Sequence, residues 1–235
     1  MQIRNQIKTA KPKTAGVWDY FSLGLTAFGG LGMEAVYAYF LEPFVYGAPM
    51  QEWTPVQTII HWICICITWG VFGIWLLREC KEKYNVNLWA SSRPMKVWQI
   101  AAVFLFIITA VAINALEWGG LKVICEYRNK GFLLFAFQYI YYAFETVLFM
   151  MIIIFGQMAC ECWLDDSFPI QLHGKIPYGG IVCGLTWGLA HIFTKGSLLS
   201  GFNGILWGAM MGSAYILVNK DIRKAWAVMF LMFAF

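Results

Sequence analysis

Long apolar runs alternate with short polar segments along the whole chain. Six runs have close to the roughly 17 to 25 residues that an α-helix needs to cross a bilayer; they are residues 20–44, 56–77, 97–116, 132–157, 178–194 and 197–218. A seventh run, 225–235, is about half as long, so we expect its end to lie in a wet cavity or the natural chain to continue. The pattern predicts an all-α fold, a polytopic transmembrane helical bundle of about seven helices.

The composition leaves no room for a soluble domain. Hydrophobic residues make up 60% of the chain and charged residues 13%, and the mean hydropathy is +0.62. Soluble domains are about 45–50% apolar and about 25% charged. We therefore divide the chain into a basic cytoplasmic arm, residues 1–16, and a single transmembrane domain, residues 17–235, of an integral multi-pass membrane protein.

The positions of the basic residues predict the orientation. Most of the 17 lysines and arginines fall on one side of the membrane if the N-terminus is cytoplasmic, because they cluster in the arm and in segments 78–96 and 220–224. Cytoplasmic loops carry such an excess. The net charge of +4 then indicates contact with an anionic lipid bilayer, which we expect to be the plasma membrane, and does not indicate a nucleic-acid partner.

The cysteines do not form a metal-binding pattern. Cys160 and Cys162 flank Glu161, with His173 downstream, but no second spaced cysteine pair completes a zinc site. Buried thiols behave as small apolar residues. We expect no disulfide framework and no cofactor, and the sequence leaves open whether a metal binds at the acidic site described below.

Glycines recur every fourth residue in two neighbouring runs. Gly204, Gly208 and Gly212 do so in the sixth run, and Gly184 and Gly188 in the fifth. Small residues at this spacing line one helix face and let two backbones approach closely. We expect the two helices to pack tightly, with the fifth helix facing the protein interior.

Ionisable groups within the apolar runs indicate a site, because a charge in hydrocarbon is costly unless it meets a partner or water. In the fourth run Gln138, Tyr141, Tyr142 and Glu145 share one helical face. His191 lies in the fifth run, which a short loop makes antiparallel to the fourth. A carboxylate and an imidazole can then meet near mid-membrane, where the glutamate could act as a general base and the histidine as a hydrogen-bond donor or proton shuttle.

Structural roles are the alternative for each group. Glu145 could be a buried protonated acid bonded to Gln138 or a tyrosine, and His191 a satisfied core histidine. Glu34 and His61 could pair with each other or line the same cavity. For those two the structural role is favoured, because no chemical pattern surrounds them.

The last hundred residues resemble a known family. The stretch TWGLAHIF from Thr186 and the stretch GFNGILWGAMMGSAYILVNKDI from Gly201 resemble the CPBP (CAAX protease and bacteriocin-processing, or Abi) intramembrane proteases, with a core of about 132–235. The family's EExxxR motif aligns with Glu145, but Thr146 and Met150 replace its second glutamate and its arginine. The FxxxH motif aligns with the segment from Trp187 to His191. Met229 and Phe233 stand where the HxxxN motif would have histidine and asparagine.

The resemblance implies an intramembrane protease or peptide-processing hydrolase with an incomplete motif set, acting on a peptide or lipidated peptide. It implies that Glu145 activates water and His191 assists, with Asn203, Tyr141 or Gln138 replacing the lost oxyanion donors. A second hypothesis is an inactive scaffold that binds a membrane or cell-wall partner or confers immunity to a peptide toxin. A third is a proton-coupled transporter, which the lack of an inverted repeat disfavours.

Overall fold

The computed structural model describes residues 15–90, 92–167 and 174–235. Most of the predicted basic arm, together with His173, lies outside these ranges. The described residues form helices and connecting segments and contain no strand, which confirms that the fold is all-α. Its elements are α1 (Val17–Val36), a π-helix (Tyr37–Leu41), α2 (Glu42–Tyr46), a 3₁₀ turn (Met50–Glu52), α3 (Pro55–Tyr84), α4 (Val97–Trp118), α5 (Lys122–Ser167), α6 (Tyr178–Cys183), a second π-helix (Gly184–Gly188), α7 (Leu189–Lys195), α8 (Leu198–Leu217) and α9 (Ile222–Ala234).

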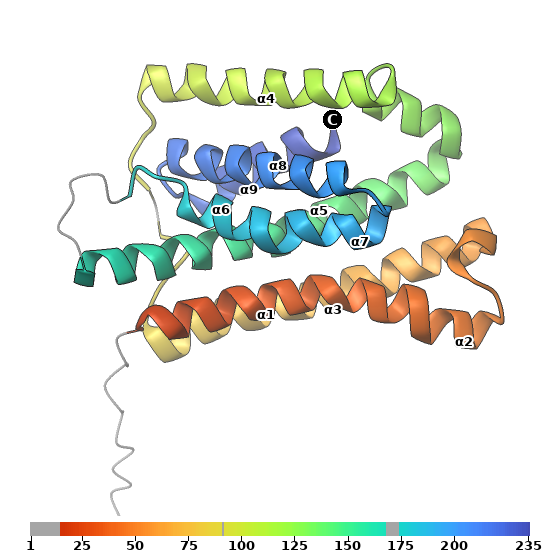
Figure 1. Ribbon diagram of the computed structural model, residues 1–235, viewed down its shortest axis with the longest axis horizontal. Coiled ribbons are helices and arrows are strands. Elements are labelled where there is room, and N and C mark those ends of the chain that lie inside the picture. Colours follow the sequence, from red (N-terminus) through yellow and green to blue (C-terminus); the bar gives the residue numbers. More distant parts are fainter. Residues whose placement is uncertain (1–14, 91, 168–173) are drawn as a thin grey trace, which may run out of the picture.

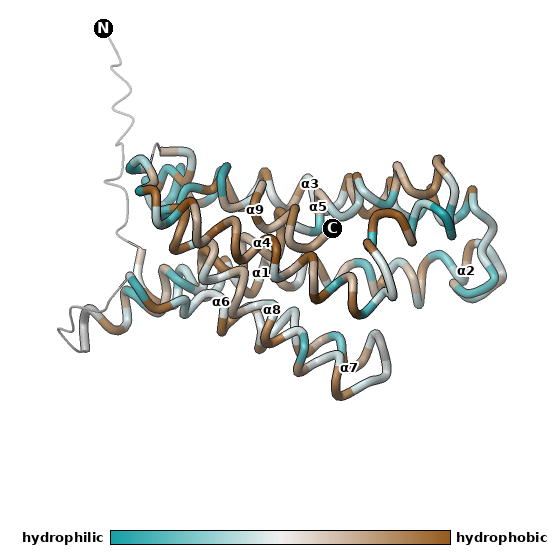
Figure 2. The backbone as a smooth tube through the Cα atoms, turned by 90° about the horizontal axis from the view of Figure 1, so that it is seen from above, coloured by the Kyte–Doolittle hydropathy of each residue, from teal (hydrophilic) through white to brown (hydrophobic). Residues whose placement is uncertain are grey.

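Three helices in the described part are long and apolar enough to cross a membrane. They are α3, α4 and α5, over Pro55–Tyr84, Val97–Trp118 and Lys122–Leu164. Each of the seven apolar runs falls on helix, and the first and fifth runs are each divided by a π-helical segment. Hydrophobic residues dominate the middles of the helices (Figure 2). The chain therefore has the character of a membrane protein.

Helix α5 is the centre of the bundle. It packs against α1, α3, α6 and α9, and its residues from Leu148 to Phe155 are almost completely buried. The helices run lengthwise, with α4 along one edge and α1 and α3 along the other (Figure 1). The perpendicular view places α3, α5 and α9 on one side and α6, α7 and α8 on the other (Figure 2).

A sharp bend near the start of α5 depends on glycine. Gly131 has φ +71° and ψ 170°, so the segment before it is a separate short helix that turns back towards α5. A residue with a side chain rarely adopts this conformation. The bend brings Glu126 against residues that lie about two to three helical turns beyond Gly131, as described below.

The predicted glycine contact is confirmed. Gly180, Gly184 and Gly188 face the glycine row of α8, and a Cβ added to Gly208 would lie 2.6 Å from the Gly184 nitrogen and 2.7 Å from the Gly180 oxygen. Such separations leave no space for a methyl group, so the two backbones are in direct contact. The contact includes Gly180, which the sequence analysis did not single out.

Candidate functional site

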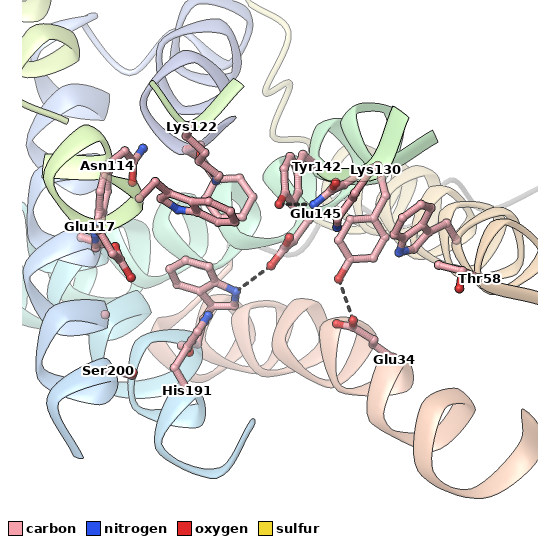
Figure 3. A pocket seen from close by; sticks show the side chains of 18 of the residues that line it. Glu34, Thr58, Asn114, Glu117, Lys122, Lys130, Tyr142, Glu145, His191 and Ser200 are labelled. Atoms are coloured by element: carbon pink, nitrogen blue, oxygen red, sulfur yellow. Dashed lines mark hydrogen bonds between the residues drawn. The ribbon is translucent and has the colours of Figure 1, made fainter. Parts of the chain in front are cut away.

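The ionisable groups of several helices meet at one cavity of about 800 Å³ (Figure 3). Its wall combines acidic, basic and aromatic side chains: Glu34, Glu117 and Glu145; His61, Lys122, Lys130 and His191; and Trp53, Trp62, Trp118, Trp187 and Trp207. All of the predicted site residues line it, namely Gln138, Tyr141, Tyr142, Glu145, His191 and Asn203. A polar hollow among apolar helices is the arrangement expected of an intramembrane site.

Trp187 links the two central groups. Its indole Nε1–H donates to Glu145 Oε1 over 3.3 Å, and its ring stands edge-on to the His191 ring at a centroid distance of 4.6 Å. Figure 3 shows Glu145 and His191 on this cavity and marks the hydrogen bond to the Glu145 carboxyl with a dashed line. The predicted carboxylate and imidazole thus share a cavity, and Trp187, the first residue of the segment aligned with the FxxxH motif, contacts both.

The backbone fixes the tautomer of His191. Its Nδ1 lies 2.8 Å from the Trp187 carbonyl oxygen, and a carbonyl oxygen can only accept a hydrogen bond. Nδ1 therefore carries the proton, and Nε2 is the basic nitrogen of the neutral ring. The π-helix just before α7 sets this position, because the Leu189 N–H donates to the Gly184 oxygen five residues earlier. Single π turns occur often at functional sites.

The second acidic group, Glu34, reaches the cavity from α1. Its carboxyl accepts a hydrogen bond of 2.7 Å from the Tyr141 hydroxyl, and the Tyr141 ring contacts the Trp69 ring in a tilted arrangement at a centroid distance of 4.9 Å. Tyr141 lies one helical turn before Glu145, so the two carboxyl groups belong to one wall. The hydroxyl group of Tyr141 is therefore already engaged as the hydrogen-bond donor to Glu34.

Gln138 and Tyr142 are bonded to Glu126. Gln138 Nε2 donates to Glu126 Oε1 at 3.0 Å, and the Tyr142 hydroxyl donates to the same oxygen at 2.7 Å. Glu126 is buried, and sequence reasoning missed it because it precedes the fourth apolar run. Glu126 lies next to Gln138 and Tyr142 only because the chain bends at Gly131. That glycine was the one feature of the sequence that could have indicated the bend.

His61 also has a partner that the sequence did not indicate. Its Nδ1 lies 2.6 Å from Glu42 Oε2, and both side chains are buried. The suggested pairing of His61 with Glu34 is therefore replaced by a pairing with Glu42. The alternative suggestion, that both line one cavity, is confirmed.

The two motif positions on α9 form an apolar wall. Met229 is fully buried, and Phe233 packs its ring against Tyr142, Phe149 and Trp187 at centroid distances of 5.0, 5.5 and 6.0 Å. Neither residue can donate a hydrogen bond from its side chain. Met229 and Phe233 therefore give α9 an apolar surface at the two positions where the HxxxN motif would place polar side chains.

The last carbonyl groups of α9 lie inside the bundle and are bonded there. The Met232 oxygen accepts from Asn114 Nδ2 at 3.2 Å, the Phe233 oxygen from Lys122 Nζ at 2.7 Å, and the Ala234 oxygen from the Tyr139 hydroxyl at 2.8 Å. Carbonyls at a helix end need such partners when water is excluded.

A second hollow of about 380 Å³ adjoins the cavity between α1 and α7. It shares Glu145, Trp187 and His191 with the cavity, and its wall also includes Phe28, Leu31 and other apolar residues. The polar site therefore continues into a hollow with partly apolar walls.

Within the described ranges, no three His, Cys, Asp or Glu residues are grouped closely enough to hold a metal ion. Comparison of the chain with protein-family models, curated proteins and solved structures gives no significant match. The chemistry of this cavity must therefore be argued from its own residues.

Proposed function

We propose that this protein is a multi-pass membrane hydrolase that cleaves a peptide or lipidated peptide within the bilayer, with its N-terminus cytoplasmic. The observation that carries the proposal is the position of Glu145 and His191 on one cavity wall, with Trp187 in contact with both. The resemblance to the CPBP proteases points the same way through Glu145 and the segment from Trp187 to His191.

Glu145 is the general base in this proposal. It removes a proton from a water molecule whose oxygen attacks the scissile carbonyl carbon, and the Trp187 N–H holds the carboxylate in place. His191 Nε2 takes that proton over from Glu145 and delivers it to the leaving amine as the C–N bond breaks, which restores the Glu145 carboxylate, while Nδ1–H stays bonded to the Trp187 oxygen. Asn203 is the remaining predicted oxyanion donor on the cavity wall, because Tyr141 and Gln138 already donate to Glu34 and Glu126.

The expected substrate has an apolar segment. The hollow between α1 and α7 leads to Glu145 past Phe28 and Leu31, and such a path suits an acyl or isoprenyl group or an apolar helix. Charged peptides would lose hydration along it without compensation.

The test compares membrane peptides in cells producing the wild-type chain or the Glu145→Gln, His191→Ala or Glu117→Gln variant. Glu117 lines the same cavity from the end of α4, whereas Glu145 and His191 lie on α5 and α7, so its substitution is a matched control. We expect new peptide termini with the wild type and the control, and their loss with the first two variants. Equal termini in all four samples, with all proteins folded in detergent, would refute catalysis at this site.

One observation favours a second function, a scaffold that binds a membrane or cell-wall partner without cleaving it. Phe233 fills the position of a polar family residue with an aromatic ring. For that function, a partner that co-purifies with the wild type should also co-purify with Glu145→Gln and His191→Ala. A partner lost with those variants would argue against it.

A further inference from the structure

A continuous apolar groove runs along α3 on the opposite side of the molecule from α7. Helices α3 and α9 each pack on α5, and the space between them is a hollow of about 590 Å³ walled by Gly73, Leu77, Val147, Trp226 and Ala227. A second hollow of about 360 Å³ continues it towards Trp62 and shares Gly70, Ile74 and Phe144 with it.

Glycines on α3 form part of the groove floor. A Cβ at Gly73 would meet Val147 at 3.4 Å, and one at Gly70 would meet the ring of Phe144 at 3.1 Å. The two glycines therefore let α3 lie close to α5, and no side chain projects from α3 at these two positions. Because α3 and α5 are two of the helices able to cross a membrane, the groove faces the region that lipid would occupy.

The groove ends beside a positive charge. Arg223 is the one charged residue in its wall among those described, and its side chain is 57% exposed. Asp221 lies 3.6 Å from it, but that carboxyl is 3% exposed and accepts bonds from Ser92 and from the first turn of α9. The chain close to this end also carries Arg78 and Lys81, which follow Leu77 on α3.

We propose that this groove binds one acyl chain of an anionic phospholipid, with the phosphate group at Arg223. From Trp62 to Leu77 the groove follows α3 for about 22 Å, which exceeds the roughly 15 Å hydrocarbon depth of one leaflet, so an extended chain fits along it.

The headgroup supplies the selectivity. Lipid tails are as apolar as the groove wall, so burying the chain there gains little over leaving it in the bilayer. A basic residue near the surface of an anionic membrane contributes about 1 kcal/mol, or roughly a fivefold preference. The site should therefore favour phosphatidylglycerol over phosphatidylcholine with identical acyl chains.

The test is native mass spectrometry of the full chain, delipidated in detergent and titrated with each of these two lipids. Ala227→Phe should abolish retention of the first phosphatidylglycerol, because Ala227 is an exposed residue of the groove wall. Ala101→Phe is the control, since Ala101 is an exposed alanine on α4 away from the groove.

Arg223→Gln should remove the preference for phosphatidylglycerol while phosphatidylcholine still binds weakly. The proposal is overturned if the wild type holds both lipids equally, or if Ala227→Phe retains phosphatidylglycerol as the control does. These results do not depend on catalysis, because Glu145 and His191 line a separate cavity.

Discussion

Substituting Gly208 by alanine tests the contact on which α7 depends. The new Cβ would lie 2.6 Å from the Gly184 nitrogen and 2.7 Å from both the Gly180 oxygen and the Gly184 Cα. Carbon atoms are in favourable contact at about 3.5–4.0 Å, so the two backbones must separate by about 1 Å. The atoms in the way belong to backbone, and no side chain can rotate aside to relieve the clash.

The cost follows from overpacking. Extra atoms in a close-packed interior destabilise by about 1–3 kcal/mol, and the higher helix propensity of alanine returns at most about 1 kcal/mol. We expect a net loss of about 1–2 kcal/mol, which for a chain of this size lowers Tm by roughly 2–8 °C. Thermal unfolding in detergent, followed by tryptophan fluorescence, measures the change.

Gly29→Ala is the matched control. A Cβ at Gly29 meets nothing within 4 Å, so the same substitution should leave Tm unchanged or raise it slightly. The reasoning is refuted if Gly208→Ala is as stable as Gly29→Ala, because the α6–α8 contact could then not be as close as described.

Two further predictions concern Asp221, which caps the N-terminus of α9, and the hydrogen bond from Trp187 to Glu145. Burial alone would raise the pKa of the Asp221 carboxyl, but bonds from the Lys224 N–H and the Ser92 hydroxyl and the nearby positive charges outweigh it and lower this pKa to about 2. The unfolded value is about 3.9, so this stabilisation is complete above that pH and is lost as pH falls towards 2. Asp221→Asn retains a capping side chain but cannot titrate, so its free energy of unfolding should fall less than that of the wild type between about pH 4 and pH 2. An equal fall in both proteins would contradict a stabilising role for the Asp221 carboxylate. Trp187→Phe removes the N–H donated to Glu145 but keeps a ring; if the proposed hydrolysis occurs, its rate should fall about tenfold in the assay of peptide termini, and an unchanged rate would show that the bond does not position the base.

The helices could be predicted from the sequence because their signals are local. Apolar runs of bilayer length and a four-residue glycine spacing depend on neighbouring positions only. The two π-helical segments and the bend at Gly131 could not be predicted. A single glycine at the start of an apolar run, such as Gly131, is compatible with several backbone conformations. A π turn adds one residue to a helix without changing its composition.

The candidate site was predictable in its members but not in its pairings. Glu145, His191, Gln138 and the tyrosines stand out because polar groups in apolar runs need partners. Which partner each one has depends on tertiary structure. Glu126 reaches Gln138 only through the bend, and Glu42 reaches His61 only because the chain after α1 continues through a π-helix into α2.

The glycine contact and the π-helix together explain how a cavity arises between α5 and α7. Helix α6 packs on both α5 and α8, whereas α7 packs on α8. The fifth apolar run therefore begins against α5 in the core. Its glycine face then stays close to α8, as far as the contact between Gly188 and Gly204. The π turn between α6 and α7 then turns Trp187 and His191 towards Glu145. Because close packing on α8 holds α7, the side of α7 that faces α5 is lined by the polar groups of the cavity. A looser α6–α8 contact should therefore disturb the site before it unfolds the bundle.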